Sequence, residues 1–90
     1  MFDFELSDLL HLKIGKLVKK NKKLIEILNK KIQEIINNNT ETIDRYKNLK
    51  HDLSDYKRVH IDKSFVLVFQ VIKQKNFILF VDFDHHDNIY

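Results

Sequence analysis

Polar side chains that could do chemistry gather near residue 60. If residues 56–61 form a strand, Tyr56, Arg58 and His60 share one of its faces. An unperturbed imidazole titrates at about 6.5, so His60 can exchange protons near neutral pH. A lone strand histidine is more often an ordinary half-exposed residue, so the pattern alone leaves both interpretations open.

A second polar group stands near the end of the sequence. It consists of carboxylates and imidazoles, the usual metal ligands in a chain without cysteine: Asp82, Asp84, His85, His86 and Asp87. Adjacent strand residues point to opposite faces, so His85 and His86 should diverge unless the strand ends there. We therefore expect a solubilising strand end and no metal site.

Positive charge is concentrated in the first third of the sequence. Between His11 and Lys31 there are eight lysines (13, 16, 19, 20, 22, 23, 30 and 31) against the single acid Glu26, while the whole chain carries a net charge of +3. A lysine-rich face is most often merely solvated, and it can also bind nucleic acid.

Composition limits the class of protein. Ninety residues, 43% of them hydrophobic, suffice for one core and leave no room for a second domain, so we expect a single domain over residues 1–90. The absence of cysteine excludes disulfides and thiol chemistry. The start is acidic and no apolar run reaches the length of a membrane span, which predicts a cytoplasmic protein with no membrane contact.

Hydrophobic periodicity predicts the elements that position these residues. Alternation over residues 2–6 predicts a short strand, and helical spacing predicts helices from Ser7, a potential cap, to about Lys20 and from Asn21 to the asparagines 37–39. Residues 40–55 are expected to form a loop with one helical turn. Three strands should follow, at 56–61, 65–72 and 77–84, the middle one apolar on both faces and hence interior.

These elements predict an α+β fold. A short N-terminal strand and an antiparallel helical hairpin would pack on an antiparallel sheet of three to four strands. The helices should cover one face of the sheet, where Lys57, Val59 and Ile61 would lie. The other face, with Tyr56, Arg58 and His60, would remain open and polar, which makes it the natural site.

The second half of the sequence resembles the RelE/ParE toxin superfamily. The resemblance lies in Leu-Lys-His-Asp-Leu-Ser-Asp-Tyr-Lys-Arg-Val-His-Ile (49–61) followed by Phe-Val-Leu-Val-Phe-Gln-Val (65–71). The nearest likeness is to the YafQ and YoeB branches: His60 stands where YafQ-like toxins carry a catalytic histidine. The ending 84–90 is similar to their C-terminal histidine followed four residues later by an aromatic, which selects His86 and Tyr90.

The resemblance implies a ribosome-dependent endoribonuclease that cuts messenger RNA and inhibits translation. The family reaction uses the RNA's own 2′-hydroxyl and requires no cofactor or metal. His60 and His86 would be base and acid in an order left open, Arg58 or Lys47 would stabilise the phosphate, and Tyr90 would stack on or hydrogen-bond RNA. Further contacts to RNA or the ribosome are expected from Lys13, Lys16, Lys19, Lys20, Lys23, Lys47, Lys50, His51, Lys57 and Lys63.

Three departures from the family pattern keep alternatives open. The loop histidine thirteen residues before His60 is replaced by Lys47, the acid after the turn by Ser64, and the strand arginine of RelE and YoeB relatives by Val66. The chain could therefore be a ParE-like gyrase inhibitor, or an inactive toxin that retains only antitoxin binding. In each case the resemblance implies a RelB-like antitoxin as partner, possibly in a heterotetramer.

Overall fold

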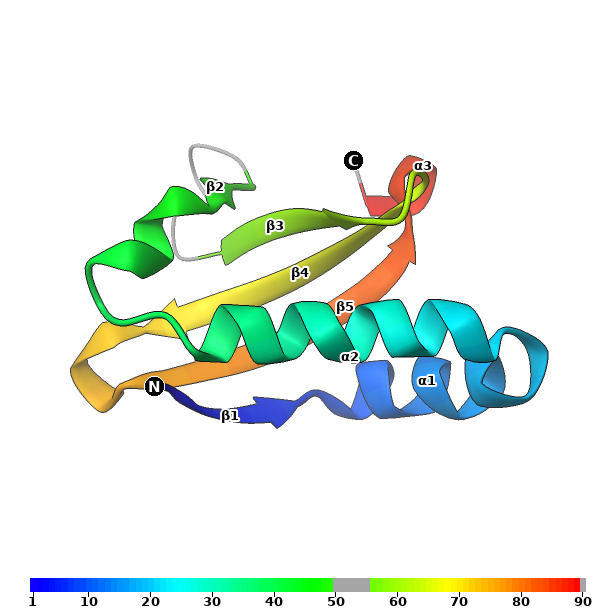
Figure 1. Cartoon of the computed structure of the whole chain (residues 1–90), viewed down its shortest axis with the longest axis horizontal. Coiled ribbons are helices and arrows are strands. Elements are labelled where there is room, and N and C mark those ends of the chain that lie inside the picture. Colours follow the sequence, from blue (N-terminus) through cyan, green and yellow to red (C-terminus); the bar gives the residue numbers. More distant parts are fainter. Residues whose placement is uncertain (50–55, 90) are drawn as a thin grey trace.

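Five strands form one sheet in the part of the chain that the computed structural model describes, residues 1–49 and 56–89 (Figure 1). The elements in chain order are β1 (Asp3–Leu6), α1 (Asp8–Lys20), α2 (Lys22–Ile36), the 3₁₀ turn η1 (Thr42–Arg45), β2 (Lys47–Asn48), β3 (Tyr56–Ile61), β4 (Phe65–Ile72), the 3₁₀ turn η3 (Lys73–Lys75), β5 (Phe77–His85) and α3 (His86–Ile89).

Both long helices begin at the caps that the sequence predicts. The Ser7 hydroxyl accepts a hydrogen bond from the Leu10 amide at 3.1 Å, and its own proton goes to the Val81 carbonyl, which joins α1 to β5. Asn21 ends α1 and caps α2, because its side chain accepts from the Leu24 amide at 3.1 Å. Each cap satisfies an amide that the first helical turn leaves without a partner.

The strand order is β1-β5-β4-β3-β2, which places the apolar β4 in the centre as expected. β3, β4 and β5 form the predicted antiparallel meander, but the sheet is larger than the three to four antiparallel strands that we expected. β1 pairs with β5 in parallel, and β2 pairs with β3 inside the segment predicted to be a loop. The predicted helical turn in that segment is η1, whose Ile43 is buried.

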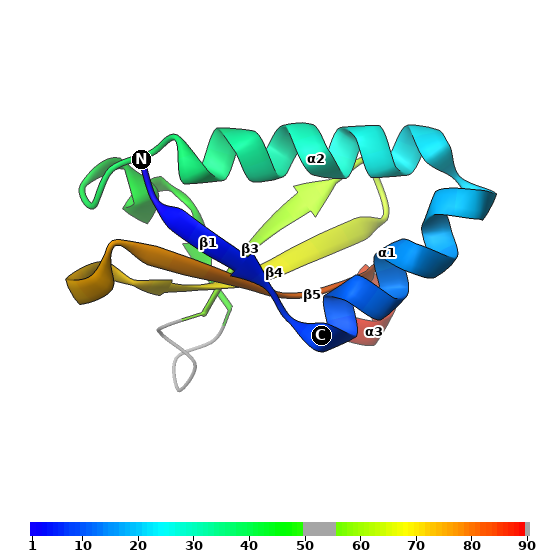
Figure 2. The same ribbon diagram turned by 90° about the horizontal axis from the view of Figure 1, so that it is seen from below.

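The hydrophobic core lies between α2 and one face of the sheet (Figure 2). The α2 stripe contributes Leu24, Ile25, Leu28, Ile32, Ile35 and Ile36, and the strands contribute Ile61, Leu67, Phe69, Ile78, Phe80 and Phe83. The 3.6-residue period of the helix and the two-residue period of the strands place these apolar side chains on facing surfaces. α3 lies on the opposite side of the sheet from α2 (Figure 2).

The face opposite α2 is shaped by a β-bulge in β5. Val68 pairs with Asp82 and Phe69 with Phe80, so Val81 is the extra residue. The bulge changes the alternation, with the result that Phe80 and Phe83 both reach the core.

None of the helices within residues 1–49 and 56–89 is long and apolar enough to cross a bilayer.

Candidate functional site

The strand register aligns the candidate residues in two rows across the face opposite α2. Residues directly opposite each other in neighbouring strands present their side chains on the same face. Lys47 is opposite Arg58, which is opposite Val68. His60 is opposite Val66, which in turn is opposite Asp84, so two strand spacings, about 10 Å, separate the backbones of His60 and Asp84.

Lys57, on the face covered by α2, holds the β2 end of the row formed by Lys47, Arg58 and Val68. Its side chain is buried among residues on the covered face, where Nζ donates to the Tyr46 carbonyl at 3.1 Å and to Asn48 Oδ1 at 3.0 Å. Both acceptors flank Lys47 in the sequence. The buried ammonium therefore holds β2 against β3, and Lys47 lies beside Arg58.

Tyr46 connects this corner to the end of α2. Its ring packs edge-on against Phe69 with centroids 5.7 Å apart, and its hydroxyl donates to Glu34. This hydrogen bond is the largest cause that lowers the pKa of Glu34. The buried Asn38 amide donates to the carbonyls of Glu34 and Ile35, both at 3.0 Å, which satisfies the end of the helix.

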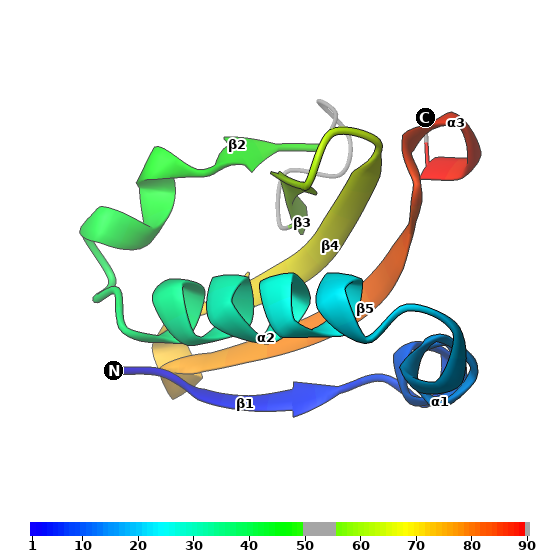
Figure 3. The ribbon, with the colours of Figure 1, turned by 45° about the vertical axis from the view of Figure 1, so that its right-hand side comes forward.

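A basic hollow of about 260 Å³ opens at this corner and is lined by Arg45, Tyr46, Lys47, Arg58, Val59 and His60. Three permanent cations and one imidazole thus surround a single depression. A groove of about 350 Å³ runs along the same face, between Leu49 and Tyr56 on one side and Asn88 and Ile89 of α3 on the other, with Val68, Val81 and Asp82 also lining it. Figure 3 shows the β2 region and α3 on either side of β4.

An ion triad ties α1 to the far edge of this face. Lys13 Nζ lies 2.6 Å from Asp82 Oδ1 and 2.7 Å from Asp84 Oδ2. Burial by itself would lower the pKa of Lys13, but the two hydrogen-bonded carboxylates outweigh it and raise that pKa. The hydrogen bond from Lys13, followed by one from Asn88, lowers the pKa of Asp84 to about 2.

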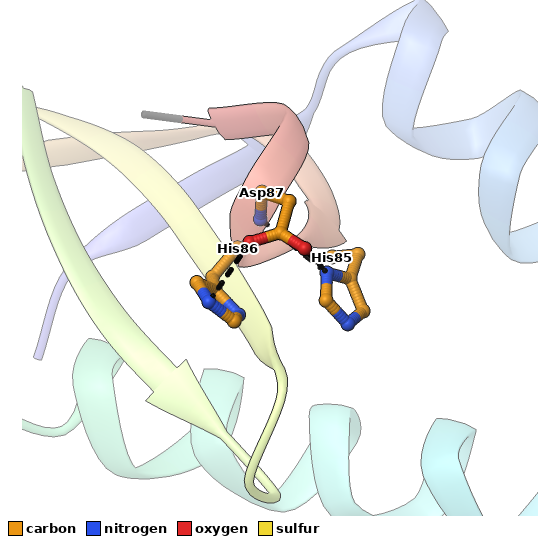
Figure 4. A group of neighbouring side chains, drawn as sticks. All are labelled: His85, His86 and Asp87. Atoms are coloured by element: carbon orange, nitrogen blue, oxygen red, sulfur yellow. Dashed lines mark hydrogen bonds and ion pairs between the residues drawn. The ribbon is translucent and has the colours of Figure 1, made fainter.

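The C-terminal histidines meet where β5 ends and α3 begins (Figure 4). Their rings stack with centroids 4.9 Å apart and planes inclined by 27°. His86 Nδ1 lies 3.2 Å from the Ser64 carbonyl oxygen and Nε2 lies 3.0 Å from Asp87 Oδ1. The two histidines were expected to diverge unless the strand ended there, and this exception applies, because β5 ends at His85 and the chain turns into α3.

Only some of the other predicted residues lie where they could bind RNA. His60 is exposed in the basic hollow, while the hydrogen bond and ion pair of His86 go to Ser64 and Asp87 and not to His60. Lys57 and Lys13 were expected to contact RNA, but one is buried and the other is paired with two aspartates. Of the lysines expected to contact RNA or the ribosome, six are exposed: Lys16, Lys19, Lys20, Lys23, Lys47 and Lys63. Lys50, His51 and Tyr90 lie outside the described residues.

Sequence reasoning missed two contributors. Arg45 reaches the basic hollow from η1, and Ser64 holds His86 through its carbonyl. Asp87, which the sequence offered only as a possible metal ligand, lies beside both C-terminal imidazoles. The sequence signal for Arg45 was the helical turn expected within residues 40–55. Asp62 near the missing family acid adopts a left-handed φ of 55°, which suits an aspartate in the turn between β3 and β4.

Two archaeal proteins are similar in sequence to the whole chain. One from Methanocaldococcus jannaschii, named "Putative toxin RelE4", is 50% identical over 90 residues, which are all of this chain and 92% of that protein. One from Methanosarcina mazei is 46% identical over the full length of both. No protein-family model matches the sequence.

Solved structures share the fold. A metal-bound toxin from Helicobacter pylori superposes with a TM-score of 0.77 and 28% identity over the full length of both chains. YafQ from E. coli gives 0.73 with 18% identity over 100% of this chain and 99% of YafQ, and the intact E. coli RelBE toxin–antitoxin complex gives 0.70 with 19% identity over 94% and 96%. With a RelE relative at 50% identity across the entire sequence, the chain belongs to the RelE family of toxins.

Proposed function

We propose that this toxin is an endoribonuclease that cuts messenger RNA on the ribosome and so inhibits translation, with residues 1–90 acting as one toxin domain. The observation that carries the proposal is the basic hollow, where Arg45, Lys47, Arg58 and His60 surround one depression at the β2–β3 corner of the sheet. A phosphodiester is the anion that such a site fits, because guanidinium and ammonium groups bind phosphate oxygens strongly.

The cross-strand register supports an anionic ligand. Lys47 and Arg58 are direct neighbours on the same face, and like charges opposite each other destabilise a sheet. Their proximity is maintained from the other face by the Lys57 hydrogen bonds. A phosphate near the two side chains would be attracted by both cations, so the arrangement favours RNA over a neutral ligand.

The proposed reaction needs one proton acceptor and one donor. A base removes the 2′-hydroxyl proton, the 2′-oxygen attacks phosphorus, and the bond to the 5′-oxygen breaks as an acid donates a proton to that oxygen. The products are a 2′,3′-cyclic phosphate and a 5′-hydroxyl. We assign the base to His60 in the basic hollow, and the acid to the protonated form of His86, in which Nδ1–H faces the Ser64 carbonyl and Nε2–H faces Asp87 at 3.0 Å.

The missing family arginine is compatible with this mechanism. Val66, which stands at the position of this arginine, is fully buried, so the position contributes to the packing of the sheet and carries no charge. Arg58 lies on the neighbouring strand and Lys47 beyond it, both on the same face, and they can stabilise the charge that develops on the phosphate. The gyrase-inhibitor alternative has no comparable support from these residues, since it needs neither an acid nor a base.

The proposed partners are a RelB-like antitoxin, messenger RNA and the ribosome. A structural relative, E. coli RelBE, is a toxin–antitoxin complex. The groove beside α3 has Leu49, Val68, Val81 and Ile89 in its lining, which suits an amphipathic antitoxin segment. Exposed lysines of α1 and α2, among them Lys16, Lys19, Lys20 and Lys23, suit ribosomal RNA.

The test is induced expression without antitoxin, with mapping of cuts in ribosome-bound messages. Wild type should arrest growth and produce new cuts. His60→Ala and His86→Ala should each abolish the cuts, whereas the matched control His11→Ala, at an exposed position of α1, should behave as wild type. Growth arrest with intact messages would refute the nuclease proposal and favour gyrase, and no arrest would favour the inactive binding module.

A further inference from the structure

Three adjacent side chains form a compact group of potential metal ligands at the end of β5. The ligand atoms of His85, His86 and Asp87 all lie within 4.8 Å of one another (Figure 4). The His85 ring is also oriented by Phe65, which it meets edge-on with centroids 5.8 Å apart. The group therefore has a defined geometry although its members are partly exposed.

Hydrogen bonding indicates which nitrogen of His86 is available. Nδ1 lies 3.2 Å from the Ser64 carbonyl oxygen, which can only accept, so Nδ1 is the nitrogen that carries a hydrogen. The neutral imidazole then has its lone pair on Nε2. This nitrogen lies 3.0 Å from Asp87 Oδ1, which is also an acceptor.

The same reasoning applies to His85. Its Nδ1 accepts a hydrogen bond from the Asp87 backbone amide at 3.3 Å, so the lone pair of the ring is on that nitrogen. The Asp87 Oδ2 atom lies 3.5 Å away from it. Two imidazole nitrogens that carry no hydrogen thus lie near the two oxygens of one carboxylate. Such a convergence of acceptors is stabilised by a positive charge among them, which can be a proton or a metal ion.

We propose that His85, His86 and Asp87 form a binding site for a divalent transition metal of the Zn²⁺ class. Imidazole nitrogen and carboxylate oxygen are both zinc ligands, with bonds of about 2.0–2.2 Å. Tetrahedral coordination at these lengths separates ligand atoms by roughly 3.3–3.6 Å, so the widest pair must close by about 1 Å. Rotation of exposed side chains provides this movement, and water completes the coordination.

Hydrogen bonds from the surrounding backbone and side chains orient the three residues of the group. The Ser64 carbonyl holds the non-ligating nitrogen of His86, the arrangement by which proteins orient metal-binding histidines. Asp84 receives hydrogen bonds from the His85 amide at 2.7 Å and from Asn88 at 3.1 Å, which fixes the turn that carries all three ligands. The site thus depends on backbone geometry as well as on three side chains.

The test is calorimetric titration of the full chain with ZnCl₂ at pH 7.5. We expect one Zn²⁺ per chain, with affinity reduced about tenfold or more in His85→Ala and in Asp87→Asn and unchanged in His11→Ala. At pH 5 the affinity of the wild type should fall, because zinc must displace protons from imidazole. Circular dichroism of each variant would establish that it remains folded.

The alternative outcomes are distinct. Absence of binding at millimolar Zn²⁺, or equal binding by the wild type and both ligand variants, would overturn the proposal. Binding that His11→Ala removes would place zinc elsewhere. Because the titration contains no RNA, its result is independent of whether the nuclease proposal holds.

Discussion

Asp84 joins three parts of the molecule, and Asp84→Asn tests how the C-terminal end of the site is held. Its carboxylate accepts hydrogen bonds from Lys13 of α1, from Asn88 of α3 and from the His85 amide. The Lys13 bond is the largest cause that lowers its pKa from 3.8 to about 2. That difference corresponds to roughly 2.5 kcal/mol between the charged and protonated forms.

Solvent reduces this value, because 31% of the Asp84 side chain is exposed. We therefore expect Asp84→Asn to lower the free energy of unfolding by about 1–2 kcal/mol at pH 7. Since the folded-state pKa lies below the unfolded one, the contribution is fully present well above pH 3.8 and is lost as the pH falls toward 2. The wild type and the variant should thus converge in stability between pH 4 and pH 2.

Urea denaturation followed by circular dichroism from pH 7 to pH 2 measures this difference. The matched control is Asp3→Asn, at an exposed position of β1, which should change the free energy of unfolding by no more than about 0.5 kcal/mol. A loss in Asp84→Asn that stays constant down to pH 2 would refute the electrostatic reasoning, because it would show that the shape of the side chain, and not its charge, is stabilising.

Two further changes probe the basic hollow and the zinc site. Lys57→Met should destabilise the fold by about 1–3 kcal/mol, because the Tyr46 carbonyl and Asn48 Oδ1 lose their buried donor. Urea midpoints check this against the exposed Lys63→Met, which should unfold as wild type does. Zn²⁺ should inhibit RNA cleavage by the wild type, because the metal would occupy His86 Nε2. Unchanged cleavage with one Zn²⁺ bound per chain would contradict the proposal that His86 is both a zinc ligand and the catalytic acid.

Local sequence signals predicted most of the fold. Ser7 and Asn21 cap the helices that the sequence places after them, and the limits of β3 and β4 agree with the alternation of apolar residues. The two-residue β2 could not be predicted, because its pairing depends on Lys57, a charged residue with no local sign that it would be buried. The parallel pairing of β1 also arises from a contact distant in sequence.

The candidate site was predicted less completely than the fold. The face shared by Arg58 and His60 follows from strand alternation alone. The meeting of His85 and His86 depends on where β5 ends, and there the Ser64 carbonyl in the preceding turn accepts a hydrogen bond from the His86 amide and faces His86 Nδ1. Lys13 was expected to contact RNA because its charge is visible in the sequence, whereas the aspartates that pair with it are about 70 positions away.

The pairing of β1 with β5 also bears on when the toxin can first act. Asp3 of β1 aligns with Phe77 and Leu6 with Phe80, so this edge of the sheet cannot close until residues 77–80 have been synthesised. Contacts between such distant residues slow folding, because a long loop must be closed before they form. The helical hairpin can form early, whereas β5, which carries Asp84 and leads into His86, emerges after the rest of the sheet. A nascent chain that has not yet released β5 therefore has no assembled candidate site, and an antitoxin could bind during that interval.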